Sequence, residues 1–164
     1  MYHCCAFHHY HERPPRSIRL PIIAASRDSI QSNKPTLDPD IAAQFTIQVC
    51  TSTSCTRKLN KVGLDRFHVL GEIYAQAQSA NLEKRMTIED GGCQGGRNCK
   101  MGPCVAILHE DFEGNVALEG MNSNEFLERV FHNVLTNDDA GRVWGCIENA
   151  ISLMAEEFNT NGDD

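Results

Sequence analysis

This 164-residue sequence has few basic residues, no long apolar run and no C-x-x-C motif. Lys and Arg number 15 against 22 Asp and Glu, a formal charge of −7, which argues against a nucleic-acid-binding protein because phosphate contacts need clustered basic residues. No run approaches the ~18 apolar residues of a membrane-spanning helix, so we expect no insertion into a membrane. No Ser-His-Asp or paired-carboxylate arrangement stands out, so nothing indicates an enzyme with that chemistry.

The basic residues that are present gather in the N-terminal segment. Residues 1–27 carry four Arg and one acidic residue, a charge of +3, whereas residues 28–164 carry 11 basic and 21 acidic residues, a charge of −10. An Arg-bearing, acid-poor start is typical of a transit peptide into a mitochondrion or plastid, and a disordered leader on a cytoplasmic protein is the alternative. We do not expect secretion, because the apolar stretch over residues 20–25 is shorter than the ~7 residues of the shortest secretory signals.

Composition and periodicity divide the chain into three parts. Residues 1–43 form the leader and a linker rich in Ser, Pro and Asp, and residues 44–136 hold the strand and helix patterns of one domain. Residues 137–164 hold an amphipathic helix and a polar tail, and the stretch 137–141 is expected to break the chain before that helix.

Alternating apolar residues predict four strands in the domain. They are expected over residues 45–50, around 86–88, and over residues 104–109 and 115–120. The last two flank the turn Glu113-Gly114-Asn115 and are therefore expected to form a hairpin.

Helical spacing of apolar residues follows the first strand and the hairpin. We expect one helix over residues 64–80 and another that begins at Asn122 or Ser123. The second helix is expected to have one apolar face, made of Phe126, Leu127, Val130, Phe131 and Val134. A strand–helix–strand half joined to a hairpin with a helix behind it predicts an α/β fold, a small mixed β-sheet flanked by helices.

Eight cysteines are the main chemical feature of the chain. Without a secretory signal we expect metal binding rather than disulfides, which persist only in oxidising compartments. Four cysteines follow predicted strands: Cys50 and Cys55 follow the first, and Cys93 and Cys99 follow the second. Neighbouring parallel strands bring their carboxyl ends to one edge of a sheet, so the two pairs can converge there. Four thiolates suit a 2Fe–2S cluster, two for each iron.

The surroundings of these cysteines also suit a negatively charged cluster. Glycines near the second pair allow backbone N–H groups to approach the sulfurs, and such hydrogen bonds tune the potential of a cluster. These glycines are Gly91, Gly92, Gly95, Gly96 and Gly102. A helix expected after Cys55 adds the positive end of its dipole.

The cysteine motifs carry a resemblance to a known family. They are V-C-T-x-x-x-C from Val49, G-C-x-G from Gly92 and C-x-x-G-P-x-V from Cys99. Over residues 45–135 the sequence resembles the thioredoxin-like 2Fe–2S ferredoxins, which include small homodimeric ferredoxins and the related cluster subunit of NADH dehydrogenases and hydrogenases.

The resemblance implies a thioredoxin-like fold that binds one 2Fe–2S cluster through Cys50, Cys55, Cys93 and Cys99. It implies a carrier of single electrons, not an enzyme in itself, with a potential on the order of −400 mV. It also implies redox protein partners, a reductase or an acceptor enzyme, and work as a homodimer or as a subunit of a larger complex. The acidic body would suit a basic patch on such a partner. The fold further suggests a cis bond before Pro103, at the start of the third strand.

The second cysteine pair departs from the family spacing. The family usually places three residues between its third and fourth cysteines, whereas five lie between Cys93 and Cys99. Longer loops cost little, so the pair can still form. Cys104 is the alternative third ligand.

Other uses of these side chains stay open. A structural zinc site or a cluster-free interaction module is one alternative, although zinc sites favour tighter knuckles than the gaps of four and five residues here. A thiol-based redox enzyme is another, although it usually carries C-x-x-C. We expect His109 in the hairpin and His132 on a helix to pack or lie at the surface, and Cys146 to act as a small hydrophobe on the last helix.

Overall fold

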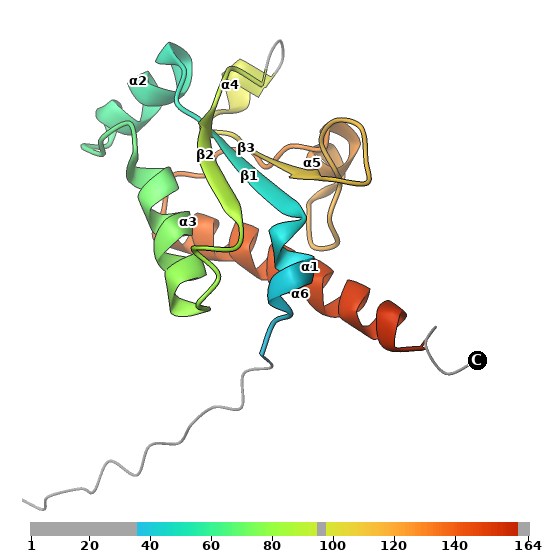
Figure 1. The fold of residues 1–164 in the computed structure, drawn as a ribbon. Coiled ribbons are helices and arrows are strands. Elements are labelled where there is room, and N and C mark those ends of the chain that lie inside the picture. The colour runs from blue at the N-terminus through green and yellow to red at the C-terminus, as the bar shows by residue number, and fades with distance from the viewer. Residues whose placement is uncertain (1–35, 95–97, 161–164) are drawn as a thin grey trace, which may run out of the picture. The chain divides into compact units, whose positions relative to one another are not determined.

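A three-stranded sheet lies at the centre of the structure, a computed structural model that describes residues 36–94 and 98–160 (Figure 1). The elements are α1 (Pro39–Ala43), β1 (Phe45–Cys50), α2 (Thr53–Lys61), α3 (His68–Ser79), β2 (Thr87–Gly91), α4 (Asn98–Met101), β3 (Val105–His109), α5 (Ser123–Glu128) and α6 (Asn137–Thr160). The predicted α/β fold with a small mixed sheet and helices is confirmed. The first 35 residues of the predicted leader lie outside the described residues.

β1 is the central strand, and its two neighbours run in different directions. β2 pairs with it in parallel, with Cys50 opposite Gly91, and β3 pairs with it antiparallel, with Phe45 opposite His109. The strand order is β2-β1-β3. Because β1 and β2 are parallel, as predicted, their carboxyl ends lie at the same edge of the sheet.

The larger part of the core lies on the face of the sheet that α3 and α6 cover (Figure 1). Side chains alternate along β1, so that Phe45, Ile47 and Val49 are buried on this face. α6 contributes Val143 and Ile147, both fully buried. The C-terminal helix is therefore part of the main core.

A second, smaller buried group lies at the carboxyl end of β1. It consists of Cys50, Cys55, Cys104, Ala106 and Val130. Cys50 follows Val49 in the strand, so its side chain points to the sheet face opposite α3 and α6. This group places three sulfurs inside the protein, away from the main core.

The helix predicted over residues 64–80 begins later than expected. α3 starts at His68, because Gly63 has a positive φ of 79° and the Asp65 carboxylate accepts a hydrogen bond from the backbone N–H of Phe67 at 2.6 Å. A separate helix, α2, precedes this turn and contains Cys55 in its first turn, whereas the sequence places Cys55 ahead of the helix expected over residues 64–80. Periodicity could not show α2, since only Cys55 and Leu59 are buried in it.

The hairpin predicted after β3 is largely missing. A single bridge joins Leu108 to Asn115, and the N–H of Val116 donates to the carbonyl of Ile107 at 2.8 Å. The rest of the stretch 115–120 is not a strand, so that prediction is wrong. Leu118 turns instead into the main core.

α5 is shorter than predicted, although its start is as expected. The Asn122 side chain caps it and forms a capping box with Glu125. The helix ends at Glu128, because Arg129 adopts a left-handed conformation with φ of 54°. Phe131 then pairs with Val105 of β3, which excludes the single apolar helix face predicted for this region. Two residues of that face are exposed, Phe126 and Leu127.

Both ends of the described chain differ from the composition-based divisions. Residues 39–43 fall in the predicted linker but form α1, capped by Asp38, whose carboxylate accepts from the N–H groups of Asp40 and Ile41. The break predicted over residues 137–141 is the first turn of α6, where acidic residues favour a helix start. Within the described ranges, none of the helices has the length and apolar character to cross a bilayer.

Candidate functional site

Cys50 and Cys55 form a buried pair at the carboxyl end of β1. Cys50 is the last residue of the strand, and Cys55 lies in the first turn of α2, which follows at once. Their Sγ atoms are 3.3 Å apart, and both residues are at most 2% exposed. Ser52, the N-cap of α2, places its Oγ 3.2 Å from the Sγ of Cys50. The turn from strand to helix thus puts two thiols in contact inside the protein.

Cys93 and Cys99 form a second pair, nearer the surface. Cys93 follows the end of β2, and Cys99 lies in α4. Their Sγ atoms are 2.9 Å apart, with Cys93 exposed and Cys99 partly exposed. α4 lies against α2, where the side chain of Lys58 donates a hydrogen bond to the carbonyl of Lys100.

The two pairs lie at the same end of the sheet. In the register of β1 with β2, Cys50 is opposite Gly91, two residues before Cys93. Figure 1 shows α2 and α4 together at this end. The pKa of Cys99 is raised, mainly by its hydrogen bond with Cys93 and to a smaller extent by the charges of Cys55 and Cys50. The structure therefore places the four cysteines that the sequence motifs singled out at the same end of the sheet, as two separate pairs.

Cys104 adds a third buried sulfur beside the first pair. It immediately precedes β3, and its carbonyl accepts a hydrogen bond from the N–H of Cys50 at 2.9 Å. The sequence motifs make Cys104 only an alternative to Cys93 as the third ligand. The structure places Cys104 with the buried pair, whereas Cys93 contacts Cys99 despite the longer loop between them.

Hydrogen bonds from neighbouring thiols lower the pKa of Cys55. A hydrogen bond with Cys104 and a weaker one with Cys50 lower the pKa of Cys55 to about 5, although burial opposes this shift. The hydrogen bond with Cys55, together with burial, raises the pKa of Cys104 far above its ordinary value. Burial raises the pKa of Cys50. These hydrogen bonds therefore favour the thiolate form of Cys55, which is the ionised form that metals bind.

Gly102 brings the backbone against this thiolate. A Cβ atom at this position would overlap the Sγ of Cys55 and would lie 3.7 Å from the Sγ of Cys104. The Gly102–Pro103 bond is cis, which confirms the expectation for Pro103. Only glycine leaves room for the sulfur at this position.

The donor set fits a two-iron cluster. Such clusters bind two thiolates at each iron, and the structure presents its thiols as two close pairs. A tetrahedral metal about 2.3 Å from each thiolate holds neighbouring sulfurs roughly 3.8 Å apart. The Sγ atoms of the two pairs are closer than that, at 3.3 and 2.9 Å. Among the residues that the structure describes, no group of three or more Cys, His, Asp or Glu side chains is placed to hold a metal ion.

The other residues considered from sequence do not join these sulfurs. Cys146 is buried in the main core, as expected for a small hydrophobe, and burial raises its pKa. His109 ends β3 and is buried. His132 is also buried, but it follows α5 instead of lying on a helix, and its Nε2 is 3.2 Å from the carboxylate of Glu128. Cys4 and Cys5 lie outside the described residues.

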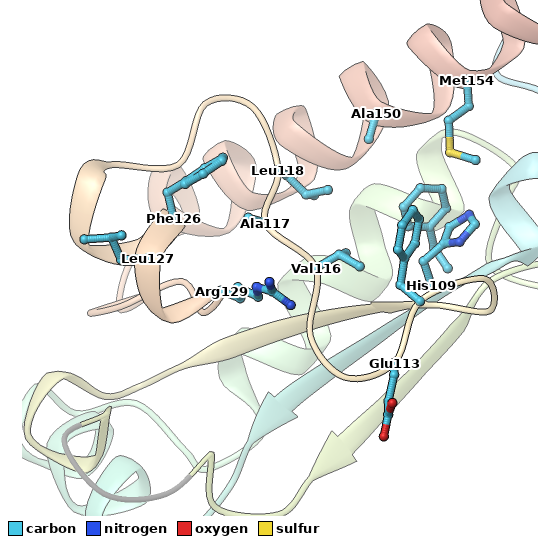
Figure 2. Close-up of a pocket in the computed structure, with 12 residues that line it drawn as sticks. His109, Glu113, Val116, Ala117, Leu118, Phe126, Leu127, Arg129, Ala150 and Met154 are labelled. Atoms are coloured by element: carbon cyan, nitrogen blue, oxygen red, sulfur yellow. The ribbon is translucent and has the colours of Figure 1, made fainter.

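An apolar cavity of about 520 Å³ lies at the opposite end of β1, lined by β3, the loop after it, α5 and α6 (Figure 2). Figure 2 shows Ala150 and Met154 of α6 on one side of it and Val116 on the other, while the carboxylate of Glu113 points away. No cysteine lines this cavity. It is therefore separate from the sulfur site.

Comparison with known proteins gives no relative for this chain: no family model, no curated protein and no solved structure matches it. Its function is therefore inferred from its residues and their geometry.

Proposed function

We propose that the protein is an electron carrier that holds one 2Fe–2S cluster in a thioredoxin-like fold. The observation that carries this proposal is the presence of two close cysteine pairs, from separate parts of the chain, at the carboxyl ends of β1 and β2. Two thiolates for each of two irons is the coordination of this cluster type.

The topology supports the thioredoxin-like part of the proposal. A parallel unit from β1 to β2 is followed by the antiparallel β3 and by a helix packed on the sheet, in the order that the family resemblance implies. The hairpin partner expected for β3 is reduced to the bridge at Asn115. The proposed fold is therefore thioredoxin-like with a sheet that lacks a full partner strand for β3.

Cys50, Cys55, Cys93 and Cys99 are the residues that would hold the cluster, which supplies a one-electron site when bound. The chain itself provides ionised sulfur at Cys55 and excludes water from the first pair. Gly102 allows the backbone to approach the sulfur closely, and backbone dipoles near sulfur tune the potential of such sites. The first turn of α2 adds its partial positive charge beside Cys55.

The arrangement suits electron transfer to another protein. The first pair is buried, whereas Cys93 is exposed, so the site reaches the surface on one side. A reductase or an acceptor enzyme is therefore the expected kind of partner, and the family resemblance adds a homodimer or a larger redox complex. Location in a plastid or mitochondrion stays a prediction from the N-terminal segment.

Metal and sulfide analysis of the full chain, purified without oxygen, tests the proposal. A carrier should contain about two iron and two labile sulfide per chain, appear reddish brown, and give a rhombic EPR signal once reduced. A colourless protein with stoichiometric zinc would contradict it and favour a structural zinc site. A protein without metal would favour a cluster-free interaction module.

Serine substitutions test the ligands. Replacement of any of Cys50, Cys55, Cys93 and Cys99 should remove most of the iron. Cys146→Ser is the matched control, because that cysteine is buried elsewhere. Cys104→Ser should keep the iron and shift the potential, since Cys104 bonds to Cys55. Loss of iron with Cys104→Ser but not with Cys93→Ser would make Cys104 the third ligand.

A thiol-based redox enzyme is the second candidate function. The lowered pKa of Cys55 and its 3.3 Å contact with Cys50 are features of a reactive dithiol. Both residues are at most 2% exposed, however, and exchange with a partner's disulfide requires access to the attacking sulfur. Rapid alkylation of Cys55 in metal-free protein, with disulfide reductase activity, would favour this candidate over the carrier.

A further inference from the structure

The end of the molecule that holds the four cysteines carries charge of the opposite sign to the whole chain. α2 and α4 contain four basic residues and no acidic one: Arg57, Lys58, Lys61 and Lys100. α6, by contrast, contains five acidic residues and one basic residue: Asp138, Asp139, Glu148, Glu156 and Glu157 against Arg142. A basic face therefore lies beside the sulfur site, although the formal charge of the whole chain is −7.

A polar hollow of about 350 Å³ lies at this basic end. Its lining residues are Thr51, Thr53, Thr56, Arg57, Asn60 and Arg66. Thr51 directly follows Cys50 and Thr56 directly follows Cys55, so the hollow adjoins the buried sulfur pair. Two guanidinium groups and the hydroxyls of Thr51 and Thr53, with no carboxylate among the lining residues, are suited to an oxygen anion. The hydroxyl of Thr56 donates to the carbonyl of Thr51 at 3.0 Å.

The basic groups are placed to meet another molecule. Arg57, Lys61 and Lys100 are exposed, and none of the ion pairs between described residues involves them. Arg66 is exposed as well, and its guanidinium lies over the ring of Phe67, 4.5 Å from the ring centroid.

Three acidic residues lie near the same end. Asp65 precedes α3 and binds the N–H of Phe67, while Glu89 and Asp90 lie on β2, where Glu89 accepts a hydrogen bond from Gln48 at 2.9 Å. None of them lies on α2 or α4 or lines the hollow. They reduce the positive charge of this end but do not interrupt the basic face.

We propose that the face formed by α2 and α4 docks an acidic surface of a partner protein, with one partner carboxylate seated in the hollow between Arg57 and Arg66. Net charge alone would select a basic partner. The charges close to the contact determine which partner binds, however, because salt screens charges farther away than ~8 Å at physiological ionic strength. The inference rests on the proposed function for its purpose, since this face adjoins the site from which electrons would leave.

Two haem proteins of opposite charge test the proposal: cytochrome b5, which is acidic, and cytochrome c, which is basic. Calorimetric titration of the full chain, purified without oxygen, measures the binding of each at low and at physiological ionic strength. Docking at the basic face predicts that cytochrome b5 binds and that added salt weakens its binding. Absence of cytochrome b5 binding at low salt, or binding of cytochrome c alone, would overturn the proposal.

Charge reversal locates the contact. The double variant Arg57→Glu with Lys61→Glu changes two exposed positions of α2 and should weaken cytochrome b5 binding at low salt roughly tenfold. The matched control is Lys84→Glu with Arg85→Glu, which makes the same change of charge at exposed residues before β2, at the other end of the sheet. Equal weakening by both double variants would show that only net charge matters and would overturn the proposal.

Hydrogen–deuterium exchange separates this inference from the proposed function. Protection of α2 and α4 by cytochrome b5 supports the docking face, and protection confined to α6 contradicts it. If a protein without iron shows the same protection, the docking face is supported and the electron-carrier proposal is overturned. If a protein with iron shows no protection, the electron-carrier proposal is supported and the docking face is overturned. Protection of the hollow by inorganic phosphate, with no cytochrome b5 binding, would reveal a small-anion site and overturn protein docking.

Discussion

Among single residues, Gly102 is the one most tightly constrained by the sulfur site. A methyl group there would collide with the Sγ of Cys55. We therefore expect Gly102→Ala to lower the free energy of unfolding by about 1–3 kcal/mol, as overpacking of a filled interior does, and to reduce the iron bound per chain. Gly92→Ala is the control, because no atom of a described residue lies within 4 Å of a Cβ at that position. Urea unfolding and iron analysis measure both effects, and equal results for the two variants would contradict the role of Gly102.

The cysteines show which contacts between residues sequence motifs predict and which they do not. Spacing and strand order are sufficient to predict that Cys50, Cys55, Cys93 and Cys99 gather at one edge, because each follows one of two parallel strands. They do not predict the hydrogen bond between Cys104 and Cys55. That bond joins a side chain of α2 to one just before β3, and neither periodicity nor motif spacing reports contacts of that kind.

At the scale of elements, the carboxylate of Glu125 connects α5 to α6. The fully buried side chain of Glu125 accepts two hydrogen bonds from Arg142, at 2.9 and 2.8 Å, and one from the N–H of His132. We expect Glu125→Gln to cost about 2–3 kcal/mol, less than the 3–5 kcal/mol typical of a fully buried pair, because Arg142 keeps contact with water. Urea unfolding measures the cost. Glu72→Gln, at an exposed position of α3, should change stability little.

The same pair predicts how stability depends on pH. Burial opposes ionisation of Glu125, but hydrogen bonds from Arg142, His132 and Asn122 outweigh it and hold the pKa below the usual 4.5. The folded chain therefore binds a proton here less readily than the unfolded chain does. The stabilisation is complete above the usual pKa and is lost as the pH falls through the lower pKa of the folded state. Below pH 4.5 the stability of the wild type should fall more steeply than that of Glu125→Gln, and parallel curves would contradict this.

Strands were easier to predict than helices in this chain, for a physical reason. β1 has one buried face, so alternation along residues 45–50 reveals it directly. α2 is mostly exposed, and a local left-handed residue, Arg129, ends α5 before its apolar pattern stops. Once the helix has ended, pairing between Phe131 and Val105 determines the path of the chain, and this long-range contact overrides local propensity.

At the scale of the whole molecule, chemical features separate along β1. The carboxyl end of the strand meets the cysteines and the basic helices α2 and α4, while Phe45 at its other end lines the apolar cavity of Figure 2. Net charge averages over both ends and therefore suggests a basic partner. Composition does not record where along the strand the charges lie. The basic residues of α2 and α4 lie at the end that bears the sulfurs, so that end predicts an acidic partner instead.

The start of the folded unit gives a prediction for the whole chain. Composition places the domain start at residue 44, but Ile41 and Ala42 of α1 are buried in the main core, and α1 packs on β1 and α6. A chain beginning at residue 36 keeps all of α1 and serves as the reference. A chain beginning at residue 44 should lose about 2–4 kcal/mol, comparable with deleting one buried isoleucine side chain.

Urea unfolding and iron analysis of the two shortened chains compare fold and site in one experiment. Both chains keep Cys50, Cys55, Cys93 and Cys99, and α1 lies at the amino end of β1, away from the sulfurs. The chain from residue 44 should therefore unfold at lower urea yet bind as much iron below its transition. Equal stability of the two chains would show that α1 contributes nothing to the core. A parallel loss of iron under native conditions would show that the sulfur site depends on packing at the far end of β1.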